Sequence, residues 1–176
     1  MRDVDIPPDE SVDPPASWVS PEFEWWDRSR CRTPMPWSGD PGAGFSTGRP
    51  WLRLGPDAAT RNVAAQRADP DSVFALYRRL IALRAASPAL QVGDLRLEPE
   101  AVGDVVAYSR TTGDQTMVVV VNLGRAATTW RLAEPGGRAG WRLVLRTGGP
   151  PEADTVLDGG APIELEPDAA MILLAT

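Results

Sequence analysis

The chain of 176 residues contains no histidine, no lysine and a single cysteine, Cys31. Without histidine it can form neither a Ser-His-Asp nor a Cys-His nucleophile system, and no histidine-based metal site. One cysteine excludes an internal disulfide framework and a cysteine-cluster zinc site. We therefore expect no metal and no cofactor. Cys31 is interpreted as a structural thiol, because it has no histidine partner.

Excess positive charge and long apolar runs are missing as well. Eighteen arginines face 24 acidic residues, which gives a net charge of −6. That balance argues against nucleic-acid binding, which draws on a surplus of Lys and Arg. The longest apolar stretch, residues 169–175, is too short to cross a bilayer, and the start of the chain lacks the apolar run of a secretory signal. The sequence predicts a cytoplasmic protein that binds neither nucleic acid nor a membrane.

Proline and tryptophan are concentrated at the start of the chain. Residues 1–56 hold ten of the 18 prolines and five of the seven tryptophans, without a helical or alternating apolar period. Dense proline blocks long helices and central strands, whereas disordered segments are poor in aromatic residues. We predict a long loop whose aromatic rings need a packing surface that the downstream residues do not fully supply.

A helix is predicted over about residues 69–87. Asp69-Pro70-Asp71 is a start signal, with Asp69 at the N-cap and Pro70 at the first helical position, and Ser87-Pro88 is a stop signal. Apolar residues recur between these signals at spacings of three and four, at Val73, Phe74, Leu76, Tyr77, Leu80, Ile81 and Leu83.

Beyond about residue 91 the apolar period switches to two. Short runs bounded by turn residues predict strands at 95–98, 105–110, 115–123, 127–132, 141–146, 163–166 and 170–175. Residues 111–114 are predicted to form a four-residue hairpin turn. About seven short strands at this pitch predict an antiparallel β-sandwich, so the chain is expected to be mainly β.

Side chains suited to sugar binding gather in residues 25–37. This segment sets three arginines and one aspartate among three tryptophans and two prolines. Aromatic rings can stack on the apolar face of a sugar while charged side chains bind its hydroxyls. Equally, the tryptophans could wedge a long loop against a core while the arginines lie at the surface, and both interpretations stay open. The acidic residues lie mostly in turns, where they cap the backbone, so no carboxylate pair stands out.

The order of residues in this region also resembles a known family. Arg-Cys-Arg-Thr-Pro-Met-Pro-Trp at 30–37 is followed by Ala-Gly-Phe at 43–45 and Pro-Trp-Leu at 50–52. This order resembles the R-T-P-M-x-W, A-G-F and P-W-L stretch of the α-glucosidases, within the α-amylase-type glycoside hydrolase family. Oligo-1,6-glucosidases and trehalose synthases belong to the same group. The resemblance continues to Gly93, and Val118–Leu123 resembles the C-terminal domain of the family more loosely.

The resemblance implies a fold. In that family a (β/α)8 barrel carries the active site, and an antiparallel β-sandwich follows it. Residues 1–91 are then expected to be the remnant of the barrel end, with the long loop and the final barrel helix. Residues 92–176 are expected to be the C-terminal β-sandwich domain.

The resemblance also implies a function, which is retaining hydrolysis or transfer of an α-glucosyl unit in the parent enzyme. The catalytic aspartate, the glutamate acid and a His-Asp pair of the family lie upstream of this region. We therefore assign no catalytic residue to this chain and expect it to be inactive alone. An arginine of this loop helps close the glucose subsite in relatives. Arg32 is the first candidate for that role, Arg28 the second, and Phe45 a candidate wall residue. An α-glucoside or maltooligosaccharide would bind only with the missing barrel.

Residues 1–7 resemble an internal piece of the family, so we hypothesise that Met1 is an internal methionine and the chain a fragment or truncated reading frame. A hypothesis of another class is a stand-alone β-sandwich that binds glycans or stabilises a partner without catalysis. A third is a non-functional remnant.

Overall fold

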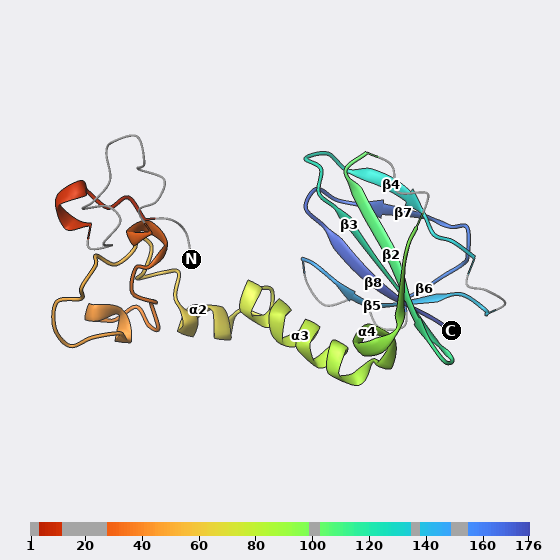
Figure 1. The fold of residues 1–176 in the computed structure, drawn as a ribbon, viewed down its shortest axis with the longest axis horizontal. Coiled ribbons are helices and arrows are strands. Elements are labelled where there is room, and N and C mark those ends of the chain that lie inside the picture. The colour runs from red at the N-terminus through yellow and green to blue at the C-terminus, as the bar shows by residue number, and fades with distance from the viewer. Residues whose placement is uncertain (1–3, 12–27, 99–102, 135–137, 149–154) are drawn as a thin grey trace. The chain divides into compact units, whose positions relative to one another are not determined.

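The computed structural model describes residues 4–11, 28–98, 103–134, 138–148 and 155–176 (Figure 1). The chain divides into two compact units, Met1–Phe74 and Ala75–Thr176. Trp18, Phe23 and the Trp25-Trp26-Asp27 part of the sugar-binding candidate segment lie outside the described residues, as does Met1. Within the described ranges no helix has the length and apolarity needed to span a membrane.

The first unit is built mostly from turns, as the proline density predicts. Its regular elements are η1 (Pro8–Glu10), η3 (Ser29–Cys31), η4 (Pro41–Gly44) and α2 (Val63–Ala68). A small apolar cluster of Val4, Ile6 and Leu52 lies inside it. The backbone N–H of Val4 donates to the carbonyl of Arg30 at 3.0 Å, which ties the start of the chain to η3.

The helix predicted from residue 69 begins later than expected. α3 spans Val73–Ala86, and α2 lies just before it. Asp69 is the C-cap of α2 and lies too early to be the N-cap of α3; its carboxylate accepts from the backbone N–H of Asp71 in the turn between the two helices. The side-chain oxygen of Gln66 accepts from the backbone N–H of Phe74 at 3.2 Å and so serves one of the first N–H groups of α3. The predicted end of the helix, before Pro88, agrees with the structure, since α4 (Pro88–Val92) begins with that proline.

The second unit is mainly β. Among the residues that the structure describes, eight strands follow α4, namely β1 (Asp94–Leu97), β2 (Val105–Thr112), β3 (Gln115–Asn122), β4 (Thr128–Arg131), β5 (Trp141–Arg146), β6 (Val156–Leu157), β7 (Pro162–Leu165) and β8 (Ala170–Ala175). A six-stranded sheet has the order β1-β2-β3-β8-β5-β6, and β4 pairs with β7 in a second, two-stranded sheet. Every strand pair is antiparallel (Figure 1).

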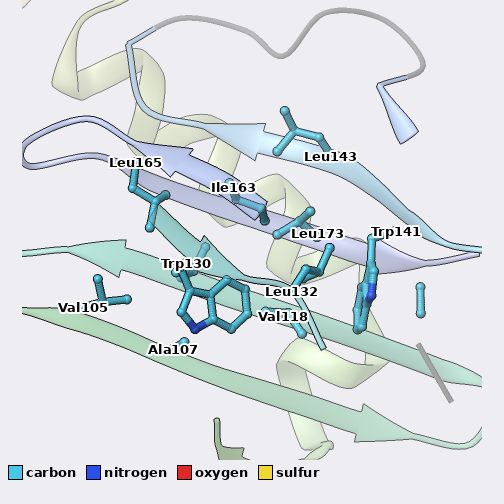
Figure 2. Close-up of a cluster of buried hydrophobic side chains, with 12 residues drawn as sticks. Val105, Ala107, Val118, Trp130, Leu132, Trp141, Leu143, Ile163, Leu165 and Leu173 are labelled. Carbon is cyan, nitrogen blue, oxygen red and sulfur yellow. The ribbon is translucent and has the colours of Figure 1, made fainter. Parts of the chain in front are cut away.

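The two sheets share a buried apolar core. Figure 2 shows Trp130, Leu132, Ile163 and Leu165 from the two-stranded sheet and its continuation, facing side chains of the larger sheet such as Leu173. In β5, Trp141 and Leu143 belong to this core with the exposed Arg142 between them, and beyond a register shift Leu145 belongs to the cluster on the other face. Where apolar and polar residues alternate in the sequence of β7, the apolar residues are the ones that face this core.

The other face of the six-stranded sheet is covered by helices. Ala89 and Leu90 of α4 pack with Met117, Val119 and further sheet residues. Three leucines of α3 lie half-buried against the same cluster, at Leu76, Leu80 and Leu83.

Two details of the β-region differ from the sequence prediction. The hairpin turn has two residues and not four, because β2 continues through Thr112 and β3 begins at Gln115. Gly113 has φ +49° at the first central position of this turn, where glycine is favoured. β6 is only two residues long and was not predicted.

Candidate functional site

Arg28 and Arg32, the two candidate arginines, flank the turn η3. The backbone N–H of Cys31 donates to the carbonyl of Arg28 at 3.1 Å, and the N–H of Arg32 donates to that of Ser29 at 3.2 Å. Ser29 is buried between the arginines, and its hydroxyl contacts the hydroxyl of Ser11 at 3.1 Å. Both guanidinium side chains are exposed. The turn therefore presents two cations on the same short element.

Cys31 lies in the same turn, and its thiol is exposed. The sulfur donates to the backbone carbonyl of Arg28 at 3.2 Å. This contact gives the thiol a local role in closing the turn, as the interpretation of a structural thiol expects.

Phe45 lies in a second loop, which a tight glycine turn closes. The carbonyl of Ala43 accepts from the backbone N–H groups of Trp37, at 2.8 Å, and Ser38, at 3.1 Å. Gly44 has φ +64°, and a Cβ there would lie 3.2 Å from the Cβ of Trp37. The positive φ and the close approach both require glycine.

Three aromatic side chains of the first unit are strongly exposed. Trp37, Phe45 and Trp51 expose 50%, 44% and 56% of their surface. Trp51 directly precedes the buried Leu52, so the backbone is anchored while the ring remains outside. Such rings provide large apolar surfaces, which mark interaction sites when they gather on one unit.

The structure brings the candidate residues together only in pairs. η3 joins Arg28 and Arg32, and the turn closed by Ala43 joins Trp37 to the segment of Phe45. Because Arg28, Arg32 and Phe45 are all exposed, they do not line an enclosed pocket.

An ion pair joins two distant segments of the first unit. Arg53 binds Glu10 with two hydrogen bonds, Nε to Oε2 at 2.8 Å and Nη2 to Oε1 at 2.5 Å. These hydrogen bonds lower the pKa of Glu10 and raise the pKa of Arg53. The bidentate ion pair connects η1, which contains Glu10, to the segment that contains Arg53. Each of the two charged groups therefore has its partner within the first unit.

A cavity of about 890 Å³ opens in the second unit, beside β4. Asp104, Arg125 and Thr128 line it, together with Trp130. Trp130 is only 3% exposed, so its ring offers no stacking platform for a sugar. The cavity contains none of the candidate residues.

One further feature is the exposed part of the apolar stripe that the sequence predicts on α3. α3 exposes Val73, Tyr77 and Ile81, at 64%, 63% and 66%, and their spacing of four residues places them on one face. Together with the half-buried leucines, the apolar residues cover roughly half of the helix circumference at 100° per residue. In the sequence this feature is visible as an apolar stripe that is wider than a helix needs when it packs against one surface only.

Comparisons with known proteins connect these features. A family model described as the catalytic domain of alpha-amylase matches residues 1–93. The chain is 33% identical over 132 residues to a probable alpha-glucosidase of Rhizobium meliloti (strain 1021), covering 75% of this chain and 23% of that protein. It is 39% identical over 119 residues to the trehalose-6-phosphate hydrolase of Escherichia coli (strain K12), covering 67% of this chain and 21% of that protein.

Solved structures give the same picture. The trehalulose synthase MutB of Pseudomonas mesoacidophila MX-45 matches with a TM-score of 0.79 at 27% identity, over 99% of this chain and 33% of that one. The chain therefore spans 21–33% of the length of these relatives.

Proposed function

This chain belongs to the alpha-amylase family, and from that membership we propose that it carries the C-terminal part of an α-glucosidase-like glycoside hydrolase. The match of the catalytic-domain model to residues 1–93, followed by a β-rich unit, carries the proposal. The parent reaction would be retaining hydrolysis or transfer of an α-glucosyl unit, through a covalent glycosyl-enzyme intermediate.

The proposal assigns residues 1–91 to the end of a (β/α)8 barrel and residues 92–176 to a C-terminal β-sandwich. The exposed apolar face of α3 supports the first assignment, because a final barrel helix needs packing surfaces on two sides. The core shared by the two sheets supports the second.

Arg32, Arg28 and Phe45 are proposed to form a wall of the glucose subsite. Guanidinium groups can bind sugar hydroxyls and pair with a barrel carboxylate, while an aromatic ring packs on the sugar. The exposure of all three supports a surface that another part of the enzyme completes. The substrate would be an α-glucoside or maltooligosaccharide, held only when the barrel is present, since such groups act when fixed by their surroundings.

The chain alone is proposed to be catalytically inactive, because the catalytic carboxylates of the family lie upstream of it. With a chromogenic α-glucoside, we expect the purified chain to release no more chromophore than buffer does. A full-length oligo-1,6-glucosidase serves as the positive control in the same assay. Turnover by the purified chain, lost in an Arg32→Ala variant, would show that the catalytic machinery is present and overturn the proposal.

A second candidate function is a stand-alone glycan-binding module, favoured by the exposed rings of Trp37 and Trp51. Titration with maltodextrin while tryptophan fluorescence is recorded separates the two candidates. An incomplete subsite gives no saturable change. Saturable quenching that disappears in Trp37→Ala but persists in Trp141→Phe would instead favour the module, because Trp141 is buried in the β unit.

A further inference from the structure

The β1 edge of the six-stranded sheet carries unused backbone groups. β1 pairs only with β2 among the described strands. The N–H of Glu98 donates to the carbonyl of Ala107 at 3.0 Å, in continuation of the β1–β2 register. Since backbone groups alternate in direction along an antiparallel strand, the N–H and C=O groups of Leu95 and Leu97 point away from β2. These groups form a template for another strand.

The side chains of β1 leave this edge unprotected. Leu95 and Leu97 are 59% and 69% exposed, and they lie on the sheet face that also carries Tyr108. Natural edges are blunted by proline, lysine, a bulge or a covering segment. β1 has no proline or lysine, and its register with β2 is regular.

The charges on the opposite face of β1 are self-complementary. Asp94 and Arg96 are both exposed and carry no ion pair within the described part of the chain. If two β1 strands pair antiparallel with Leu95 opposite Leu95, each Asp94 lies opposite Arg96 of the other copy. These would be non-hydrogen-bonded pairs, in which side chains approach most closely.

The alternative symmetric register is disfavoured by the same charges. Shifting the strands so that Arg96 faces Arg96 places Asp94 opposite Glu98, so every charged pair then has like sign. Like charges directly opposite each other destabilise a sheet. In the favoured register Leu97 faces Gly93, which is buried and whose N–H and C=O already bond the carbonyl of Ala89 and the guanidinium of Arg110, so the hydrogen bonds between the two strands centre on the Leu95 pair.

We propose that two copies of this chain associate through β1, antiparallel about a two-fold axis at Leu95, so that their sheets join edge to edge. The pairing of Asp94 with Arg96 favours a second copy of this chain as the partner at β1. In a second copy the opposite charges fall opposite each other because the two sequences are the same, whereas an unrelated strand has no such built-in match. An isologous two-fold interface of this kind is the commonest form of oligomer.

Sedimentation velocity of the full chain over a concentration series tests the association. We expect a species of twice the 19.0 kDa chain mass at high concentration. Arg96→Asp should weaken the dimer about tenfold or more, because both ion pairs become repulsive. The double variant Asp94→Arg, Arg96→Asp restores opposite charges and should restore the dimer. Arg142→Asp, at an exposed position on β5, is the matched control and should leave it unchanged.

Disulfide trapping tests the register. In a Cys31→Ser background, Leu95→Cys should yield a covalent dimer on oxidation, since hydrogen-bonded pairs place Cα atoms about 5.5 Å apart. Leu97→Cys should not, because its counterpart is Gly93. A chain that stays monomeric throughout, a dimer indifferent to Arg96→Asp, or trapping at residue 97 but not at 95 would each overturn the proposal.

Discussion

Asn122→Ala is expected to lower the free energy of unfolding by about 3 kcal/mol, since it strips several buried groups of their hydrogen-bond partner. The side-chain nitrogen of Asn122 lies 2.9–3.1 Å from the carbonyl oxygens of Ala126, Leu165 and Glu166, which share its two N–H donors. Its oxygen accepts from the N–H of Gly124 at 2.9 Å. One side chain thus links the end of β3, the following turn and the end of β7.

Urea unfolding followed by far-UV circular dichroism measures this loss. Asn122→Asp should be at least as damaging at neutral pH, because a carboxylate faces the carbonyls that the amide had served. Its deficit should shrink as the pH falls, since a protonated carboxyl regains one donor. Thr129→Ala, at an exposed position on β4, is the control and should change stability by less than about 0.5 kcal/mol. Equal effects at both positions would contradict the role given to Asn122.

Leu165→Ala is expected to cost about 2–5 kcal/mol, the range for removing a large buried side chain from a packed core. Leu165 is 0% exposed and lies with Trp130 and Leu173 between the two sheets (Figure 2). Its removal leaves a cavity at the contact of β7 with the larger sheet.

The neighbouring residue provides a matched control for this prediction. Glu164 lies on the same strand with the opposite orientation and is exposed, so Glu164→Ala should change stability by less than about 0.5 kcal/mol. The same urea experiment measures both variants. A small effect of Leu165→Ala would mean that the two-stranded sheet does not depend on this packing.

Most of the β-region could be predicted from the sequence, because short apolar runs bounded by turn residues mark the strands. β7 alternates exposed and buried residues, whereas β3 buries four residues in a row, Met117 to Val120, because its second face is covered as well. The two-residue β6 carries too short a pattern to detect. The hairpin turn is shorter than predicted because Gly113 adopts a positive φ. A glycine allows that conformation, but its presence in the sequence does not require it.

The helical region was harder to predict, because the deciding contacts are not local signals. Asp69-Pro70 has the composition of a helix start, but the side chain of Gln66 reaches forward to Phe74 and sets the start of α3 after Ser72. The apolar stripe of α3 was recognised, yet the sequence does not state that Leu80 packs on the sheet while Ile81 stays exposed.

The candidate site followed from motif order and not from geometry. Arg32 and Phe45 were selected by resemblance, and their exposure in the structure leaves the proposed subsite wall as a prediction. The pairing of Glu10 with Arg53 carried no sequence signal, because 43 residues separate the two side chains.

Hydrogen exchange on the isolated chain tests most directly the central proposal, which is that the first unit belongs to a larger domain while the β unit folds on its own. We expect amides of β3 and β8 to exchange at least about a thousandfold more slowly than those of Trp37 and Val63. Trp37 donates to the carbonyl of Ala43 and Val63 donates to that of Pro36, both within the turn-rich unit. Protection of Trp37 and Val63 equal to that of β3 would show a first unit that is stable by itself, and would contradict the account.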